Sequence, residues 1–306
     1  MSILVIGEAL VDVVDDGAGN LTEMPGGSPA NVAITLARLG HAPELITCLA
    51  DDPRGAVVRA WLQESGVQVR AFPPPSGRTS TAVATLASDG SASYRFDISW
   101  DLPEVTPACS VLHAGSIATA LSPGAKVVEN VMRAARGRAL VSFDPNARPQ
   151  ITPDADATRA QVERLVALAD VVKVSDEDLA WYYPGLSPSQ VALAWAASGP
   201  ALVVVTLGAD GALVVRGSDT FTVPGVKVQV ADTIGAGDTF MGALLDALIG
   251  FGATGPGARG RIEELTVADL RAAASWAARA AAITVSRLGA NPPTRAELDR
   301  DSQRCV

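Results

Sequence analysis

The residues best suited to chemistry lie first in a late glycine-rich segment. It reads Asp232-Thr-Ile-Gly235-Ala236-Gly237-Asp238, and the apolar spacing after it predicts a helix whose first turn contains Asp238. Two glycines allow a sharp turn and bring backbone N–H groups close to an anion, which the helix dipole also favours. A carboxylate beside such a turn suits phosphoryl transfer, which needs donors for the moving group and a base for the acceptor hydroxyl. Taken alone, the motif favours a simpler explanation of Asp238, as an acidic residue that stabilises a helix start, because Asp is common in first helical turns.

An earlier segment, Gly26-Gly27-Ser28-Pro29-Ala-Asn31, has a similar design. The order of glycine, hydroxyl residue and proline predicts a helix with Ser28 as its N-cap and Pro29 at its first position. Asn31 then falls in the first turn, where its amide could face a hydroxyl-bearing ligand or solvent.

Together these segments resemble the two signature stretches of the ribokinase-like (PfkB) family of carbohydrate kinases. One signature is an early Gly-Gly-x-x-x-Asn helix start, the other a late Asp-Thr-x-Gly-Ala-Gly-Asp-x-Phe loop, and both occur here in the family's order. The resemblance covers essentially the whole chain and implies an ATP-dependent sugar kinase. It makes Asp238 the base that activates the sugar hydroxyl. It also makes the amides of Gly235, Ala236 and Gly237 the anion hole for the transferred phosphoryl group.

On the sugar side, the resemblance assigns Asp12, Gly26, Gly27 and Asn31 to one pocket, in which a carboxylate can accept bonds from vicinal hydroxyls. The stretch Phe143-Asp144-Pro145-Asn146-Ala-Arg148 resembles the version typical of bacterial fructokinases. Its Arg148 would contact a ketose hydroxyl or a phosphate, or else lie exposed beside a helix.

Fructose, phosphorylated at O6, is therefore the first expectation. Another sugar kinase, acting on 2-keto-3-deoxygluconate, ribose or a nucleoside, is the alternative. A non-catalytic sugar or nucleotide sensor on the same fold is a third reading, which the intact motifs disfavour.

The nucleotide side is assigned by further resemblances. ATP is expected over Thr206-Leu-Gly208-Ala-Asp-Gly211, which resembles the family's Thr-Leu-Gly-x-x-Gly hairpin, with Lys173 also on the cofactor side. The run Lys173-Val-Ser175-Asp-Glu177-Asp178 stands where the family has Asn-x-x-Glu, which organises magnesium and phosphate. Here Ser175 replaces the Asn and Asp178 replaces the Glu.

An acidic pair, Glu177 and Asp178, nevertheless remains to serve Mg²⁺ through a retained water. Many family members also bind a monovalent cation. The resemblance places K⁺ between Asp232 and the turn that contains Gly289.

Alternating strands and helices must position these residues. Short apolar runs predict strands at 3–6, 45–49, 111–113, 139–143, 171–174, 202–206 and 226–230, with helices between several of them. Such a chain folds as an α/β domain with a mostly parallel sheet covered on both faces, and ligands bind at the carboxyl ends of the strands. The resemblance makes this the ribokinase-like three-layer sandwich, with residues 1–306 as one domain.

Two stretches without helices, about 8–25 and 72–101, are predicted to form a small β-sheet lid. In the second stretch Tyr94, Arg95, Phe96 and Trp100 alternate, which would bring aromatic rings and Arg95 against the sugar. The same apolar face could instead hold a second copy of the chain as a homodimer.

Composition narrows the class of function. The 306 residues carry a net charge of −9, whereas binding to nucleic acid regardless of sequence needs a basic face. Three cysteines without a paired spacing favour a reducing cytoplasm over a disulfide framework. Neither a signal peptide nor a run long enough to span a bilayer is found in the sequence, so we expect no membrane partner.

Overall fold

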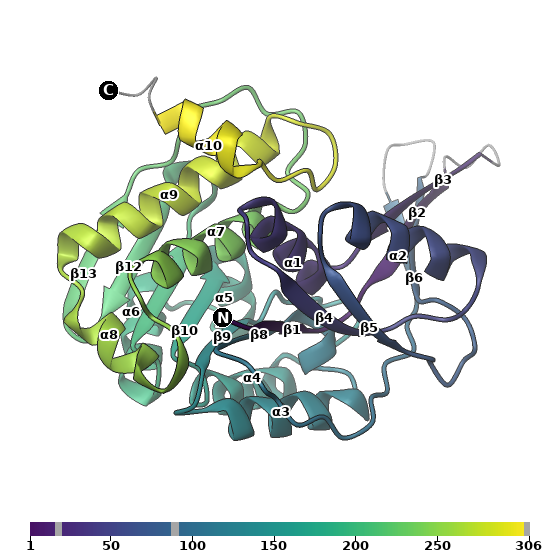
Figure 1. Ribbon diagram of the computed structural model, residues 1–306, viewed down its shortest axis with the longest axis horizontal. Helices are drawn as coiled ribbons and strands as arrows, with labels where there is room; N and C mark the ends of the chain where they lie inside the picture. Colours follow the sequence, from purple (N-terminus) through teal and green to yellow (C-terminus); the bar gives the residue numbers. More distant parts are fainter. Residues whose placement is uncertain (16–19, 87–91, 303–306) are drawn as a thin grey trace.

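A twisted central sheet carries most of the fold, and the computed structural model describes residues 1–15, 20–86 and 92–302 (Figure 1). Along the sheet the strand order is β13-β12-β11-β10-β9-β8-β1-β4-β5. The bounds are β1 (Ile3–Ile6), β4 (Pro43–Cys48), β5 (Gln68–Phe72), β8 (Val111–Gly115), β9 (Leu140–Asp144), β10 (Val171–Ser175), β11 (Leu202–Thr206), β12 (Ala212–Arg216) and β13 (Asp219–Val223). From β5 to β11 all neighbours are parallel, and β12 and β13 add an antiparallel edge.

Helices cover both faces of this sheet (Figure 1). One layer contains α1 (Ser28–Arg38), α2 (Pro53–Glu64), α7 (Ala236–Gly250), α8 (Ala258–Glu264), α9 (Val267–Val285) and α10 (Arg295–Ser302). The other contains α3 (Gly124–Ala135), α4 (Ala155–Val166), α5 (Asp176–Tyr182) and α6 (Pro188–Ser198). Successive strand residues alternate between the layers, since Ile3 and Val5 join the first core while Leu4 and Ile6 join the second. The expectation of a parallel sheet buried on both faces is confirmed.

A second, four-stranded sheet lies beside α2, to one side of the main sheet (Figure 1). Its order is β3-β2-β6-β7, with β2 (Leu10–Asp15), β3 (Leu21–Gly26), β6 (Thr81–Leu86) and β7 (Ala92–Asp97). Strands β2 and β6 pair in parallel, and the other two pairs are antiparallel. The turns expected near residues 16–17 and 89–90 lie outside the described residues.

The predicted strand at 226–230 is wrong. These residues follow β13 at the outer edge of the sheet but form no ladder, and Val228 and Val230 are 40% and 60% exposed. Their β-branched side chains favour a strand locally, but a strand also needs a partner. The segment instead crosses toward α9, where the N–H groups of Ala231 and Asp232 donate to the carbonyl oxygen of Val285.

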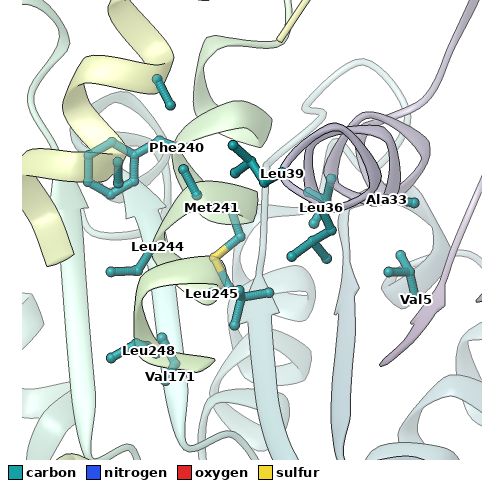
Figure 2. Close-up of a cluster of buried hydrophobic side chains, with 14 of the residues drawn as sticks. Val5, Ala33, Leu36, Leu39, Val171, Phe240, Met241, Leu244, Leu245 and Leu248 are labelled. Carbon is teal, nitrogen blue, oxygen red and sulfur yellow. The ribbon is translucent and has the colours of Figure 1, made fainter. Parts of the chain in front are cut away.

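Helices α1 and α7 pack side by side, and this contact brings the two glycine-rich segments together. Figure 2 shows Met241 and Leu245 of α7 on the side that faces Leu36 and Leu39 of α1. A Cβ added at Gly242 would lie 2.7 Å from Cβ of Thr35, so only glycine allows this approach. Both helices begin at the carboxyl ends of the parallel strands, which is where ligands of such sheets bind.

Within the described residues, we find no helix with the length and apolar character needed to cross a membrane.

Candidate active site

Asp238 lies at the centre of a buried polar cluster in which three side chains donate to its carboxylate. Ser28 Oγ donates to Oδ1 at 2.7 Å, Asn31 Nδ2 donates to Oδ2 at 2.7 Å, and Asn146 Nδ2 reaches Oδ1 at 3.4 Å. Asp238 is only 6% exposed. The structure thus joins the two glycine-rich segments at one carboxylate and adds Asn146, to which sequence reasoning gave no role.

The start of α7 has the form expected of an anion-binding turn. Gly235 precedes the first helical residue and has a left-handed φ of 73°, where a side chain would be strained. Added bulk there would also meet Ala290, whose Cβ would lie 2.6 Å away. The N–H of Ala236 donates to the carbonyl oxygen of Thr233 at 3.3 Å. The N–H of Gly237 follows in the first turn of the helix, where backbone donors have no intrahelical partner and can serve an anion.

Ser28 is not the N-cap of α1 as predicted. Gly27, with φ of 115°, holds the N-cap position and no side chain caps the helix. The Ser28 hydroxyl instead donates to the charged Asp238 carboxylate, and its oxygen accepts from Asn146 Nδ2 in place of a backbone N–H of the helix. A sequence pattern of hydroxyl residue and proline cannot distinguish these partners, since the carboxylate comes from the other end of the chain.

Asn146 connects Asp238 to Arg148. It follows β9 with a left-handed φ of 40°, a conformation that asparagine tolerates better than most residues. Its Nδ2 donates to Ser28 Oγ at 2.8 Å, and its Oδ1 accepts from Arg148 Nη1 at 2.6 Å. Arg148 is half-buried and also donates to the main-chain oxygens of Asn146 and Ala147. A pocket adjoins this segment, lined in part by Asn146, Arg148 and Tyr182.

A buried ion pair lies beneath the start of α7. Lys173 Nζ of β10 is 2.8 Å from Asp144 Oδ2 at the end of β9, and the two side chains are 4% and 0% exposed. Burial raises the pKa of Asp144 to about 6, against the opposing effect of the Lys173 charge. Burial also disfavours the charged form of Lys173, but the Asp144 carboxylate more than offsets this, so the Lys173 pKa is raised.

Lys173 also explains the second glycine of the turn. A Cβ added at Gly237 would lie 2.9 Å from Lys173 Nζ, so the ammonium sits directly against the first turn of α7. A positive charge therefore supports the backbone donors of this turn.

The predicted sugar residues at the lid side lie close together. A Cβ added at Gly26 would lie 2.1 Å from Asp12 Oδ2, so a larger residue where β3 passes Asp12 would displace the Asp12 carboxylate. Burial raises the pKa of Asp12, and the nearby charge of Arg148 partly opposes this. A Cβ added at Gly27 would lie 2.5 Å from the main-chain oxygen of Glu8. Asp12, both glycines and Arg148 therefore border the same region as Asp238.

Glu8 is a buried carboxyl group just after β1 to which the sequence assigned no role. It is 3% exposed, and its Oε2 accepts from the N–H of Ala118 at 3.1 Å. Burial raises its pKa from 4.5 to about 7, opposed by its hydrogen bonds and by the charge of Arg148.

Replacement of Glu8 with Gln is expected to change how stability depends on pH. The folded protein keeps the Glu8 proton up to pH of about 7, whereas the unfolded chain releases it near 4.5. The free energy of unfolding therefore falls as pH rises from 4.5 to 7, by about 3 kcal/mol for this group, and then levels off. Urea denaturation of both proteins across this range should show the fall reduced in Glu8→Gln. Parallel curves for the two proteins would contradict the assignment.

The residues predicted to bind the nucleotide lie at the same edge of the sheet, beginning at the end of β11, the neighbour of β10. Thr206 ends β11, and its hydroxyl approaches the carbonyl oxygen of Val174 in β10. A turn over Gly208–Asp210 then leads to β12, and Gly208 and Gly211 both have left-handed φ values.

Asp178 has a structural use that its sequence did not suggest. It forms a capping box with Ser175 at the start of α5, and its Oδ1 accepts from the N–H of Ala147. It therefore holds the segment after β9 against α5. Glu177 is exposed next to it. In the described ranges no three His, Cys, Asp or Glu side chains gather closely enough to hold a metal ion by themselves.

Asp232 joins two loops near the start of α7. Its Oδ1 accepts from Ile234 N at 3.0 Å and its Oδ2 from Gly289 N at 2.9 Å. These contacts bring Asp232 and Gly289 together, with the carboxylate of Asp232 accepting from one N–H group of each loop.

The aromatic part of the lid expectation is wrong for Trp100. This residue is 4% exposed in the core, where its Nε1 donates to the carbonyl oxygen of Ala118. Arg95 is exposed on β7, the edge strand, and is not a member of the hydrogen-bonded cluster around Asp238. The side chain of Tyr94 lies outside the described residues.

Known proteins with similar sequences and structures share one family. A profile described as pfkB family carbohydrate kinase matches residues 1–297. A fructokinase of Rhizobium leguminosarum bv. trifolii is 36% identical over 263 residues, 80% of this chain and 79% of that protein.

Two solved fructokinase structures cover nearly the whole chain. A double mutant from Vibrio cholerae O395, in fructose, ADP and potassium ion bound form, is 31% identical with a TM-score of 0.82, over 98% of both chains. The enzyme of Xylella fastidiosa with bound ATP is 26% identical with a TM-score of 0.86, over 99% of this chain and 98% of that one.

Proposed function

The chain belongs to the pfkB family of carbohydrate kinases, and from this premise we propose that it transfers the γ-phosphoryl group of ATP to O6 of fructose. The observation that carries the proposal is the Asp238 carboxylate, held by the early helix start at the mouth of a backbone anion site. Fructokinases bound to fructose, ADP or ATP among the similar structures support the choice of substrates.

In the proposed reaction Asp238 acts as general base. It takes the proton of the acceptor hydroxyl while that oxygen forms a bond to the γ-phosphorus, and the bond from the γ-phosphorus to the β–γ bridging oxygen breaks to release ADP. The amides of Gly235, Ala236 and Gly237, backed by the Lys173 ammonium, stabilise the charge on the moving group. The positive charge of Lys173 would thus act on the transferred phosphoryl group from the buried side of α7 and not from solvent.

Sugar recognition is proposed for the residues around Asp12. Asp12 offers a carboxylate to the sugar, and the backbone of Gly26 passes close to that carboxylate, followed by Gly27. Asn31 Oδ1 is buried without a hydrogen-bond partner among the described residues, because its Nδ2 must face Asp238. A sugar hydroxyl would satisfy this acceptor, as buried polar groups normally are. Arg148 supplies further donors, and Arg95 would reach the sugar only if the lid closes.

We propose that Thr206, Gly208 and Gly211 border the nucleotide. Mg²⁺ would arrive with the phosphates and keep most of its waters, with Asp178 and Glu177 acting on it indirectly. The oxygens around Asp232 and Gly289 suit K⁺, the ion named in the Vibrio cholerae structure. These ions would neutralise the charge of the phosphates and would order the loop before α7.

The four-stranded sheet is proposed as a lid over the sugar, within a single domain of residues 1–306. Its edge strand β3 exposes Leu21 by 59% and Met24 by 39%, an apolar surface that suits a homodimer. We propose the cytoplasm as the site of the reaction, because ATP is the phosphoryl donor.

A coupled ADP-release assay tests the function. Purified protein with MgATP and KCl is offered fructose, ribose, 2-keto-3-deoxygluconate and a ribonucleoside, and the same panel is run with NaCl. We expect the highest kcat/KM with fructose, and a faster rate in KCl. Highest turnover with another sugar would replace the substrate, and tight sugar binding without any turnover would contradict the enzyme assignment.

A further inference from the structure

Hydrogen-bond donors around Asp238 follow a single direction. Arg148 has only donors, so the Asn146 atom that faces it must be the amide oxygen. The amide nitrogen of Asn146 then faces Ser28 and Asp238, and it donates to Ser28 Oγ at 2.8 Å. Ser28 has one proton, which it donates to Asp238 Oδ1 at 2.7 Å. The order of donation therefore runs from Arg148 through Asn146 and Ser28 to Asp238, without a choice at any step.

The two oxygens of Asp238 differ as a result. Oδ1 accepts from Ser28 and lies 3.4 Å from the Asn146 amide, whereas Asn31 is the one donor to Oδ2 in the described part of the chain. A carboxylate oxygen can accept two hydrogen bonds. Oδ2 therefore retains capacity for one more partner, and that partner can be the acceptor hydroxyl.

We propose that Arg148, Asn146 and Ser28 form a positioning chain that anchors Oδ1 of Asp238 and leaves Oδ2 as the oxygen that takes the substrate proton. This inference rests on the proposed kinase function of the same site. In the reaction the O–H bond of the acceptor hydroxyl breaks and an O–H bond forms at Oδ2, while Oδ1 stays hydrogen-bonded to Ser28.

The positioning chain also links sugar binding near Arg148 to the proposed base, Asp238. Nη1 of Arg148 is committed to Asn146 and to the main-chain oxygen of Ala147. The charge of Arg148 also lies close enough to Asp12 to oppose the effect of burial on the pKa of that carboxyl group. A ketose hydroxyl bound to Arg148 would hold its guanidinium in place and, through Asn146, the Asp238 carboxylate. Asn146 has a left-handed φ of 40°, and its short amide lies between Ser28 and Arg148.

The kinetic test uses Ser28→Ala, Asn146→Gly and the double variant. Glycine at 146 keeps the left-handed backbone without the amide. Each single change is expected to lower kcat about tenfold or more, because a hydrogen bond to a charged acceptor is lost. KM for the sugar should stay within a few-fold in Ser28→Ala. Ser28 and Asn146 act in one positioning chain. The fold-loss of kcat in the double variant should therefore be much smaller than the product of the two single fold-losses.

Two comparisons make the kinetic result specific. Ser142→Ala removes another buried hydroxyl, which donates to the carbonyl oxygen of Leu112 and lies 3.0 Å from His113 Nδ1. Ser142 is not part of the positioning chain, so kcat and KM should be unchanged. Asn31→Ala removes the donor at Oδ2 and an expected sugar contact, and should change both constants. Independent, multiplying losses for Ser28 and Asn146, or an unchanged kcat, would overturn the proposal.

A structural readout separates failure of this inference from failure of the proposed function. The crystal structure of the ligand-free Ser28→Ala/Asn146→Gly protein is expected to show the Asp238 carboxylate rotated, with the 2.7 Å contact from Asn31 to Oδ2 altered. An unmoved carboxylate would overturn the positioning chain whatever sugar the enzyme accepts. If wild-type protein turned over none of the sugars, the proposed kinase function would be contradicted. The crystal structure of the double variant would still show whether Ser28 and Asn146 position the Asp238 carboxylate.

Discussion

Asp238→Ala is expected to lower kcat with the best sugar by about 10²–10⁴-fold, the usual contribution of a general base. Sugar affinity should change by only a few-fold, because Asp12 and the Gly26–Gly27 turn remain in place. The variant leaves Ser28 and Asn31 without their acceptor, so a modest loss of stability is expected as well. Steady-state kinetics and calorimetric titration of the sugar measure the two effects separately.

Two further proteins complete the Asp238 test. Asp238→Asn keeps the shape of the side chain and should show the same loss of kcat, which excludes a purely steric cause. Asp156→Ala serves as the matched control, since Asp156 is an exposed acidic residue early in α4 that pairs only with Arg159 in the same helix. Activity that persisted in both Asp238 variants would show that another group accepts the proton.

Lys173→Met is expected to give the largest loss of stability, about 3–5 kcal/mol, because it leaves the fully buried Asp144 carboxylate without its counter-charge. The double variant Lys173→Met/Asp144→Asn removes both charges and should regain most of that loss. Denaturant unfolding of the two single variants and the double variant measures the coupling. Arg133→Met, which breaks an exposed pair with Glu129, should cost no more than about 1 kcal/mol.

The same double variant separates stability from catalysis. Its fold should be restored, yet kcat should remain lower by roughly 10²-fold, because the ammonium beneath Gly237 no longer supports the anion hole. Full activity in the stable double variant would make Lys173 a purely structural residue. Equal stability losses in the single and double variants would instead show that the two charges are not coupled.

Much of this protein follows from local sequence. The parallel sheet was predictable because its strands are continuous apolar runs, and the strand at Leu202–Thr206 matches its predicted bounds. The capping box at Ser187, before α6, was predictable because both partners lie within four residues. Gly235 and Asp238 were identifiable because a turn and a helix start need particular residue types at fixed spacing.

Contacts between distant segments were decided only by the tertiary structure. Ser28 has the local signature of an N-cap but donates to Asp238 instead, 210 positions along the chain. Trp100 looked like a lid aromatic, but the core offered a partner for its N–H. The partner of Lys173 is Asp144, which lies 29 positions earlier in the chain and could not be identified from local sequence.

Asp238 shows the division most clearly. Sequence alone determined that an acidic residue stands in the first turn of a helix after a glycine turn. The packing of α1 against α7 at Gly242 decided which donors surround it. Local rules act over a few residues, whereas the hydrogen-bond partners of a buried carboxylate depend on which segments the core brings into contact.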